Sequence, residues 1–251
     1  MKVMAKTILI TGGSQGIGKA TALLAASRGY TVIVNYGHHV LAATQTVSDI
    51  VEAGGKASAI QADISSEQAV LDMFRVIDKQ FGYLDALVNN AAIIEPQMKV
   101  ADMMAERINK VFSTNVLGSF LCAREAVKRM STARGGKGGG IVNISSIAAR
   151  IGSPFEYVDY AASKGAIDSF TMGLSKEVAA EGIRVNAVRP GLIFTEIHAK
   201  AGEAGRVSRL EPSVPMLRGG QANEVAQAVL WLLSEEASYV TGTFLDVSGG
   251  R

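Results

Sequence analysis

Cysteine is nearly absent from this sequence, which has one cysteine among 251 residues. A single cysteine excludes an internal disulfide bond and fits a reducing compartment, so we expect a cytoplasmic protein in which Cys122 is a small buried hydrophobic residue. No apolar run reaches the ~18 residues that a membrane span needs. The N-terminus leads directly into an apolar run that we predict to be the first strand, and we therefore expect no cleavable signal peptide.

An excess of charge of one sign is also lacking, because 25 lysines and arginines oppose 23 aspartates and glutamates. The net charge of +2 argues against a surface dedicated to nucleic acid. We assign no group of residues as metal ligands. What the sequence does contain is a 48% share of hydrophobic residues, enough for a large core, and 27 glycines, which suit tight turns and close approaches of the backbone.

Strand-like and helix-like segments alternate along the whole chain. The predicted strands are 7–11, 31–35, 57–61, 84–88, 140–144, 183–188 and 243–247. The predicted helices are 16–28, 40–53, 66–81, 101–132, 157–181 and 221–234. Such alternation indicates an α/β fold with a parallel sheet covered by helices on both faces. We find no interdomain linker and no repeat. The glycine-rich patch 135–140 is interpreted as a turn, and the irregular segment of about 190–220 as a substrate lid or a surface connection.

A glycine-rich motif, Thr11-Gly12-Gly13-Ser14-Gln15-Gly16-Ile17-Gly18, follows the first predicted strand and precedes a helix. Strand, glycine turn and helix form the context in which a dinucleotide is bound. Glycines let the backbone approach a pyrophosphate, and the helix N-terminus supplies N–H groups and a positive dipole end. The spacing is Gly-x-x-x-Gly-x-Gly. A flexible turn is the alternative interpretation of this motif alone.

Tyr160 and Lys164 are four residues apart in a predicted helix. Residues at this spacing lie on the same helix face, about 5–6 Å apart at Cβ. A free phenol has a pKa near ~10 and is a poor acid or base at neutral pH. A neighbouring ammonium favours the phenolate, so we expect Lys164 to lower the pKa of Tyr160 towards the working range.

Taken together, these motifs resemble those of the classical short-chain dehydrogenase/reductase family, and the resemblance runs nearly from end to end. The remaining matching features are Asn89-Asn90-Ala91-Ala92, Asn115, Ile141-Val142-Asn143-Ile144-Ser145-Ser146 and Arg189-Pro190-Gly191-Leu192-Ile193-Phe194-Thr195. The resemblance implies a single-domain Rossmann fold over residues 1–251, with a doubly wound sheet of seven parallel strands. It also implies an NAD(P)(H)-dependent oxidoreductase that acts on a carbonyl compound or a secondary alcohol. The overall similarity is to the 3-oxoacyl-carrier-protein reductase and glucose 1-dehydrogenase branches.

The resemblance also assigns catalytic roles. Tyr160 is the expected general acid and base, and Lys164 is expected to hold the nicotinamide ribose as well. Ser146 is expected to hydrogen-bond the substrate oxygen, and Asn115 resembles a residue that carries a water in a proton relay. An Asn115 side chain satisfied by the backbone is the alternative.

Two neighbouring positions leave choices open. Only one of Ser145 and Ser146 can face the site from a strand end, and the resemblance favours Ser146. Tyr157 is assigned either to the wall of the substrate pocket or to simple packing, because the residue four positions later is Ala161.

The preferred cofactor depends on the end of the second strand. NAD-preferring folds place an acidic residue there, ~20 residues beyond the glycine turn. This chain has no acidic residue between Gly18 and Asp49. NADP(H) is therefore favoured and NAD(H) remains possible. Gln15 stands where many NADP-using relatives carry an arginine, and His38 or His39 is a candidate partner for the 2′-phosphate.

The expected cofactor site extends over most of the chain. Asp63 resembles the family residue that contacts adenine, and Ala92 replaces a glycine that is usual in the family. The complete set of expected cofactor residues is Gly12, Ser14, Gln15, Gly16, Ile17, Gly18, Asn35, Tyr36, His38, Asp63, Ile64, Asn90, Ala91, Tyr160, Lys164, Ile193 and Thr195.

The expected partners are a small carbonyl or alcohol substrate and further copies of the chain. Family relatives are commonly tetramers, so we expect a homotetramer, with a dimer as the alternative. The helices 101–132 and 157–181 and an apolar C-terminal region are the expected contacts. That region comprises Trp231, Leu232, Leu233, Tyr239 and Phe244.

Other interpretations of function remain open. Arg124, Lys128 and Arg129 could meet an acidic carrier protein, or form a solvated or interfacial helix face. A catalytically silent nucleotide sensor and a structural Rossmann protein are the alternative functions. Both are disfavoured because Asn115, Ser146, Tyr160 and Lys164 are all present.

Overall fold

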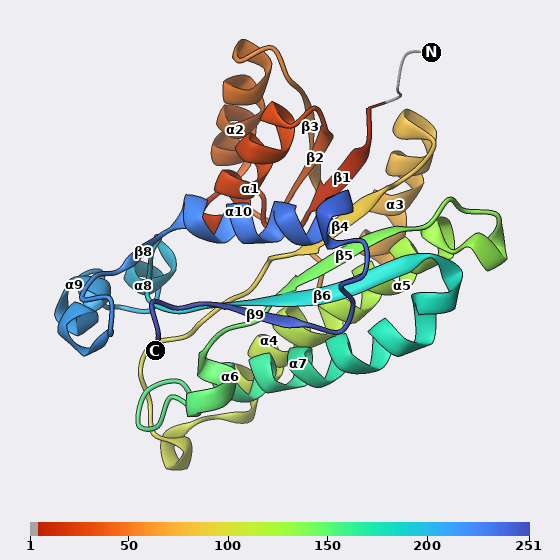
Figure 1. Ribbon diagram of the computed structural model, residues 1–251. Helices are drawn as coiled ribbons and strands as arrows, with labels where there is room; N and C mark the ends of the chain where they lie inside the picture. The colour runs from red at the N-terminus through yellow and green to blue at the C-terminus, as the bar shows by residue number, and fades with distance from the viewer. Residues whose placement is uncertain (1–4) are drawn as a thin grey trace.

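The computed structural model describes residues 5–251, and its central feature is one parallel sheet of seven strands (Figure 1). The strand order is β3-β2-β1-β4-β5-β6-β9, so the chain reverses its winding direction between β1 and β4. This is the doubly wound topology that the sequence predicted, which is confirmed. The strands are β1 (Thr7–Ile10), β2 (Thr31–Tyr36), β3 (Lys56–Gln61), β4 (Ala86–Asn89), β5 (Gly139–Ile144), β6 (Ile183–Pro190) and β9 (Phe244–Val247).

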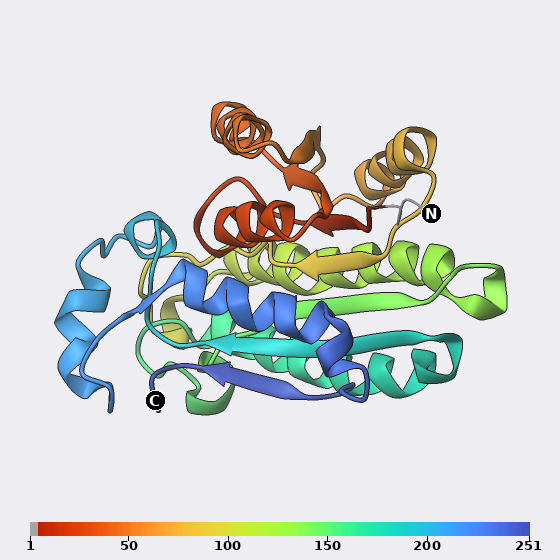
Figure 2. The same cartoon turned by 45° about the horizontal axis from the view of Figure 1, so that its top comes forward.

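Helices cover both faces of the sheet. One layer is formed by α1 (Gly16–Ser27), α2 (Val40–Glu52) and α10 (Ala222–Leu233). The other layer is formed by α3 (Glu67–Phe81), α5 (Gly118–Met130) and α7 (Val158–Val178). In Figure 2, α10 lies in front of the strands, whereas α5 and α7 lie behind them. The central strands are therefore buried on both sides.

The alternation of side chains along the strands explains this layering. Leu9 and Ile33 belong to the core cluster beneath α3 and α5, whereas Ile8 and Val32 belong to the cluster beneath α1 and α10. All four side chains have no exposed surface. Strands buried on both faces are apolar at every position, which is why they appear in the sequence as continuous apolar runs.

The predicted helix 101–132 is interrupted in the structure. It comprises α4 (Ala105–Phe112), a π-helical turn (Ser113–Leu117) and α5, and a 3-10 turn (Val100–Asp102) precedes it. π-Helical turns inside helices often occur at functional sites, and this one contains Asn115. The other short turns are 3-10 helices at Thr132–Arg134, Ala179–Glu181 and Glu235–Ala237.

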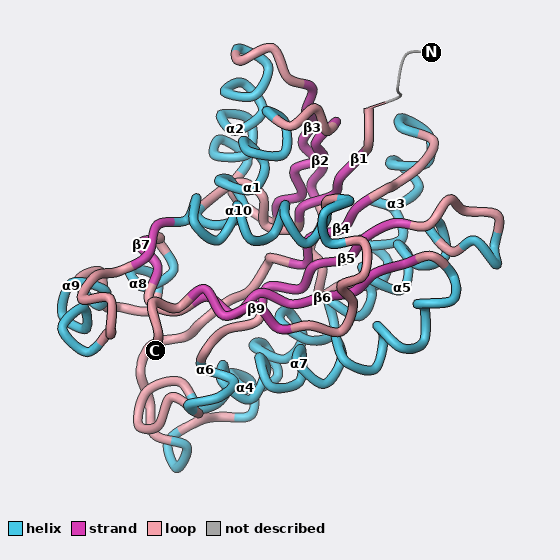
Figure 3. Tube along the Cα trace, in the orientation of Figure 1, coloured by secondary structure: helices cyan, strands magenta, loops and turns pink. Residues whose placement is uncertain are grey.

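The segment 191–220, called the lid below, has more regular structure than the sequence predicted. It contains β7 (Ile193–Phe194), α8 (Ile197–Lys200), α9 (Arg206–Leu210), a 3-10 turn (Glu211–Ser213) and the first residue of β8 (Gly220–Gln221). The lid has a small core of its own, formed by Leu192, Val207 and Val214. Figure 3 shows it gathered beyond the carboxyl ends of the strands. The short helix α6 (Ala148–Ile151) was likewise not predicted.

Within residues 5–251, no helix has both the length and the apolar character that crossing a membrane requires. The expectation about a signal peptide also involves residues 1–4, which lie outside the described part of the chain.

Candidate active site

A large cleft of about 1110 Å³ lies at the carboxyl ends of the strands. This is the edge at which open parallel sheets bind ligands, and the cleft includes the point where the winding direction reverses. Six strands each contribute a residue at or just beyond their ends. These residues are Gly12 after β1, Tyr36 at the end of β2, Asp63 after β3, Asn90 after β4, Ser146 after β5 and Gly191 after β6.

Nearly all of the predicted cofactor residues line this one cleft, although they come from distant parts of the sequence. Gly18 is the exception, because it lies behind the glycine loop. A Cβ atom on Gly18 would lie 2.3 Å from the carbonyl oxygen of Gly12 and 2.5 Å from Nδ2 of Asn90. Gly18 therefore shapes the loop, whereas Gly16, with a φ of 51°, takes a left-handed conformation at the N-terminus of α1.

Hydrogen bonds fix the glycine loop to the end of β4. The Thr11 hydroxyl accepts hydrogen bonds from the backbone N–H groups of Asn90 and Ala91, at 2.9 and 3.0 Å. Nδ2 of Asn90 donates to the carbonyl oxygens of Thr11 and Gly12, at 2.9 and 3.1 Å. These contacts connect the glycine loop that follows β1 to the segment that follows β4, on the two sides of the point where the winding direction reverses. Thr11 was part of the predicted motif but was not predicted to act in this way.

Asn35 does not contribute a free amide to the cleft. Its side chain donates to the carbonyl oxygen of Ala62 at 3.0 Å and accepts from the N–H of Gly12 at 3.4 Å. The residue is 1% exposed. Asn35 lines the cleft and its buried amide joins the ends of β1, β2 and β3, while a contact with the cofactor stays a prediction.

Several polar groups remain accessible at the outer end of the cleft. His38 and His39 line the cleft and are exposed, and Tyr36 is half-buried. Oε1 of Gln15 accepts a hydrogen bond from Nζ of Lys200, which lies in the lid, at 2.7 Å. Asp63 is exposed and accepts from the Ser65 backbone N–H at 2.9 Å. The lid therefore contacts the glycine loop directly.

Tyr160, Ser146 and Lys164 meet at the inner end of the cleft. The first turns of α7 present Tyr160 and Lys164, and the end of β5 presents Ser146. Oγ of Ser146 accepts a hydrogen bond from the Ala148 backbone N–H at 3.1 Å, and the hydroxyl lies close enough to Tyr160 to lower the pKa of the phenol. Nζ of Lys164 lies 5.5 Å from the centre of the Tyr160 ring and donates to the carbonyl oxygen of Ile144 at 2.7 Å. The Ser146 hydroxyl, the Tyr160 phenol and the Lys164 amine thus lie together at the inner end of the cleft.

The alternative serine is directed elsewhere. Oγ of Ser145 donates to Oδ1 of Asp168 at 2.6 Å and to the carbonyl oxygen of Lys164 at 3.2 Å. Asp168 in turn accepts two hydrogen bonds from Arg189, at 2.8 and 3.0 Å. Ser145 therefore ties β5 to α7, while Ser146 faces Tyr160.

The electrostatics of the tyrosine differ from the sequence-based expectation. Burial raises the pKa of Tyr160 to about 12, and the Ser146 hydrogen bond opposes this shift. Burial also lowers the pKa of Lys164 to about 8, against the attraction of Asp168. The expected lowering of the tyrosine pKa by Lys164 is absent, because burial disfavours both charged forms and the lysine is directed to Ile144. At neutral pH, Tyr160 is a protonated phenol.

Asn115 lies next to this group but does not line the cleft. Its Oδ1 accepts from the N–H of Ile93 at 2.8 Å, and its Nδ2 donates to the Ile93 carbonyl at 3.0 Å and to Oγ of Ser163 at 3.0 Å. The side chain is 1% exposed. Its polar atoms are thus used by the protein itself, as in the alternative interpretation, and Asn115 positions the cleft wall against α7.

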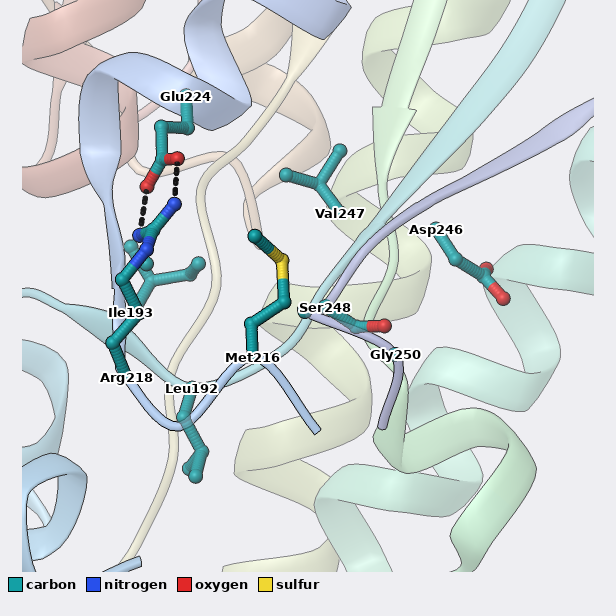
Figure 4. A pocket seen from close by; sticks show the side chains of 11 residues that line it. Leu192, Ile193, Met216, Arg218, Glu224, Asp246, Val247, Ser248 and Gly250 are labelled. Carbon is teal, nitrogen blue, oxygen red and sulfur yellow. Dashed lines mark hydrogen bonds and ion pairs between the residues drawn. The ribbon is translucent and has the colours of Figure 1, made fainter. Parts of the chain in front are cut away.

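A second, smaller cavity lies on the other side of Leu192 and Ile193 (Figure 4). Its volume is about 340 Å³. Arg218 and Glu224 form a bidentate ion pair at its rim, with distances of 2.8 and 2.6 Å. None of the groups that meet at Tyr160 lines this cavity. Among residues 5–251, no group of three or more His, Cys, Asp or Glu side chains is placed to hold a metal ion.

Comparison with known proteins identifies relatives along the whole chain. A family model described as enoyl-(acyl carrier protein) reductase matches residues 12–251. An uncharacterized oxidoreductase, YgfF of Escherichia coli strain K12, is 63% identical over 97% of this chain and 98% of its own length. Glucose 1-dehydrogenase 2 of Bacillus subtilis strain 168 is 38% identical over 98% of this chain and 94% of its own.

Solved structures agree with this result. The 3-ketoacyl-(acyl-carrier-protein) reductase from Brucella melitensis, crystallised in complex with NADH, superposes with a TM-score of 0.90 at 31% identity. The match covers 98% of each chain. The sheet and the cleft therefore belong to a fold with known oxidoreductase members.

Proposed function

This chain belongs to the short-chain dehydrogenase/reductase family, and from that premise we propose that it interconverts a small ketone or aldehyde and its alcohol with NADP(H) as the preferred cofactor. The protein is an NAD(P)-dependent oxidoreductase. The observation that carries the proposed chemistry is the convergence of Ser146, Tyr160 and Lys164 at the inner end of one cleft.

The cleft has the features that a dinucleotide requires. Gly12 has a φ of 61°, and a Cβ atom there would lie 3.0 Å from Cα of Ala91, so only glycine leaves the loop floor open. α1 begins directly after the glycine loop, and the backbone N–H groups at its N-terminus are suited to bind a pyrophosphate. The adenosine end is proposed to lie near Tyr36, His38 and Asp63, and the nicotinamide end near Ile193, Thr195 and Tyr160.

The mechanism follows from the groups at the inner end. A nicotinamide held there by the cleft residues would supply the hydride for the carbonyl carbon during reduction and would accept it during oxidation. Tyr160 donates its phenolic proton to the carbonyl oxygen as negative charge develops there. Ser146 steadies the same oxygen by hydrogen bonding. Among the described residues, Nζ of Lys164 donates one hydrogen bond, to the Ile144 carbonyl, and an ammonium has further donors for the ribose and for the developing phenolate.

A direct test is oxidation of NADPH in the presence of ketones, aldehydes, quinones and aldoses, followed by absorbance. We expect turnover with at least one of these classes. Tight binding of nucleotide without turnover of any class would support the silent sensor instead, an interpretation that gains no support from the relatives.

A substrate that is free in solution is favoured over one attached to a carrier protein. Glucose 1-dehydrogenase 2 and the 3-ketoacyl reductase represent the two possibilities among the relatives. The basic residues proposed to meet an acidic carrier are occupied within the chain. Arg124 pairs with Glu67 at 2.7 Å, Lys128 with Glu125 at 2.8 Å, and Arg129 with Asp78 at 2.6 Å.

The proposed preference for NADP(H) makes a prediction about two histidines. Replacing both His38 and His39 with alanine should lower the affinity for NADPH about 5- to 30-fold, which corresponds to ~1–2 kcal/mol for charge-assisted contacts with a phosphate. Affinity for NADH should stay the same, because NADH lacks the 2′-phosphate. The measurement is the dissociation constant of each nucleotide by fluorescence titration.

Lys19→Ala is the matched control, since Lys19 is a nearby cation that pairs with Asp49 and does not line the cleft. If the double variant kept the ratio of the NADPH and NADH dissociation constants found for the unmodified protein, the two histidines would not recognise the 2′-phosphate. A wild-type ratio that favours NADH would overturn the NADP assignment.

We also propose a homotetramer, on the basis of apolar side chains that remain exposed. Leu117 and Phe120 on the α5 side are 47% and 45% exposed, and Trp231 and Tyr239 are also exposed. Leu232 and Leu233, which were expected to contribute, instead lie in the core beneath α10, so that part of the expected contact is corrected. Phe120 stacks on Phe170 with ring centres 3.8 Å apart.

Light scattering should therefore give about four times the chain mass of 26.3 kDa at micromolar concentration. Phe120→Asp should shift the mass to a smaller species, because it places a charge on the proposed contact. Leu41→Asp is the control, since Leu41 is 83% exposed on α2 in the opposite layer. A monomer mass for the unmodified protein would refute the proposal.

A further inference from the structure

A group of polar residues lies where the lid meets the body of the protein, close to Tyr160. It comprises Glu156 and Tyr157, just before α7, and His198, Glu203 and Arg206 in the lid, and is called the lid cluster below. Four of its members, all except Glu203, line the main cleft. Tyr157 precedes Tyr160 by three residues, so the cluster adjoins the position where the substrate carbonyl is proposed to bind.

Arg206 holds the lid cluster together. Its side chain is 7% exposed and pairs with Glu156 at 2.9 Å and with Glu203 at 3.1 Å. Its guanidinium group also lies 4.9 Å from the centre of the Tyr157 ring. Because two carboxylates already neutralise this arginine, the cluster offers no surplus positive charge for a carboxylate or phosphate on the substrate. The cluster therefore favours a neutral ligand.

Two buried polar atoms of the cluster lack partners. The Tyr157 hydroxyl and Nδ1 of His198 are both buried, and neither has a hydrogen-bond partner among the described residues. The Tyr157 residue as a whole is 2% exposed. Buried polar atoms without partners are uncommon and costly, so each one calls for a missing partner. Both residues line the same cleft and both lie near Arg206, so one ligand can serve both atoms.

The state of His198 fits a neutral ligand. Burial and the nearby Arg206 lower its pKa, so the imidazole is uncharged at neutral pH. A tyrosine hydroxyl can donate to a substrate oxygen, and Nδ1 of a neutral imidazole whose other nitrogen donates to the Ile193 backbone can accept from a substrate hydroxyl. Apolar residues also line this cleft, among them Ile94, Ile151 and Pro154. The cleft thus combines the polar groups of the lid cluster with apolar side chains.

We propose that Tyr157 and His198 form a subsite for a second substrate oxygen, next to the carbonyl that Tyr160 protonates. This inference rests on the proposed function and specifies its substrate class: small, uncharged α-hydroxyketones and diketones, with vicinal diols in the reverse direction. Tyr157 and His198 are specificity-determining residues in this account. Hydride still passes to the carbonyl carbon and the proton to its oxygen, while the second oxygen is only hydrogen-bonded.

The test compares substrates of equal chain length with saturating NADPH. We expect kcat/KM for 1-hydroxybutan-2-one and butane-2,3-dione to exceed that for butan-2-one by at least about 50-fold, because a site built to bond an oxygen rejects the analogue that lacks it. Tyr157→Phe keeps the ring beneath Arg206 and removes only the hydroxyl. It should lower kcat/KM for the hydroxyketone at least about 10-fold more than for butan-2-one.

The dione is more electrophilic than butan-2-one and would react faster with any enzyme. The change in kcat/KM that Tyr157→Phe causes for each substrate is therefore the informative quantity, because the intrinsic reactivity of a substrate is the same with both proteins. Tyr83→Phe is the matched control, because the Tyr83 hydroxyl donates to the Ala5 carbonyl and the residue does not line the cleft. This variant should leave kcat/KM unchanged for all three substrates. His198→Leu, like Tyr157→Phe, should lower kcat/KM for the hydroxyketone more than kcat/KM for butan-2-one.

The outcomes of these measurements distinguish failure of the proposed subsite from failure of the proposed oxidoreductase activity. Equal kcat/KM for the oxygenated and simple ketones, or an equal loss for both in Tyr157→Phe, would overturn the subsite while leaving the oxidoreductase intact. Turnover of other carbonyl classes but none of these compounds would also overturn it. Failure with every carbonyl class tested would instead contradict the proposed function itself.

Discussion

Tyr160→Phe should lower kcat by about 10²–10⁴-fold, the usual contribution of a positioned general acid. Phenylalanine fills the same space on α7 but has no proton to give to the carbonyl oxygen and none of the contact with Ser146. Since the glycine loop that is proposed to hold the pyrophosphate is untouched, the dissociation constant for NADPH and the melting temperature should both be retained. Steady-state kinetics and a nucleotide titration on the same preparation measure these quantities.

Tyr83→Phe provides a control for loss of a tyrosine hydroxyl, because its hydroxyl donates to the Ala5 carbonyl far from the cleft. That variant should behave as the unmodified protein. If Tyr160→Phe kept turnover within a few-fold of the unmodified enzyme, Tyr160 would not be the proton donor.

Gly18→Ala should weaken NADPH binding by about 5- to 150-fold, equivalent to the ~1–3 kcal/mol that overpacking costs. The added methyl group would meet the Gly12 carbonyl oxygen at 2.3 Å, and a backbone atom cannot turn aside as a side chain can. The loop would have to move away from Asn90 and lose the geometry that the cofactor needs. The melting temperature should fall as well. Calorimetric titration and thermal unfolding measure the two effects.

Gly173→Ala is the control, since a methyl group there, within α7, meets no atom within 4 Å. It should bind NADPH normally and unfold at the same or a slightly higher temperature, because alanine favours a helix. Unchanged NADPH affinity in Gly18→Ala would mean that the glycine loop does not hold the cofactor as proposed.

The sequence was most informative where function depends on short-range geometry. A tyrosine and a lysine four residues apart must share a helix face, and α7 places both in the cleft. A glycine motif between a strand and a helix likewise fixes a local turn. Apolar runs revealed the buried strands, because strands covered on both faces are apolar at every position.

The sequence was less informative where burial or the direction of a side chain decides the role. Asn35 and Asn115 were both assigned to the functional site, yet their amides hydrogen-bond within the protein, Asn35 to the backbone and Asn115 to Ile93 and Ser163, which residue spacing does not reveal. The pKa of Tyr160 is raised chiefly by desolvation, which depends on the folded surroundings of the side chain and not on the local sequence. Arg206 and Glu156 meet across 50 residues of sequence, so no local pattern indicated their pairing.

The most direct test of the central claim follows the hydride itself. NADPH carrying deuterium at the transferable position of the nicotinamide is incubated with the enzyme and its best carbonyl substrate, and the alcohol is analysed by mass spectrometry and NMR. The account predicts one deuterium on the carbinol carbon and none elsewhere, with the yield falling in Tyr160→Phe at equal reaction time. Alcohol formed without deuterium, or nucleotide consumed without alcohol, would contradict it.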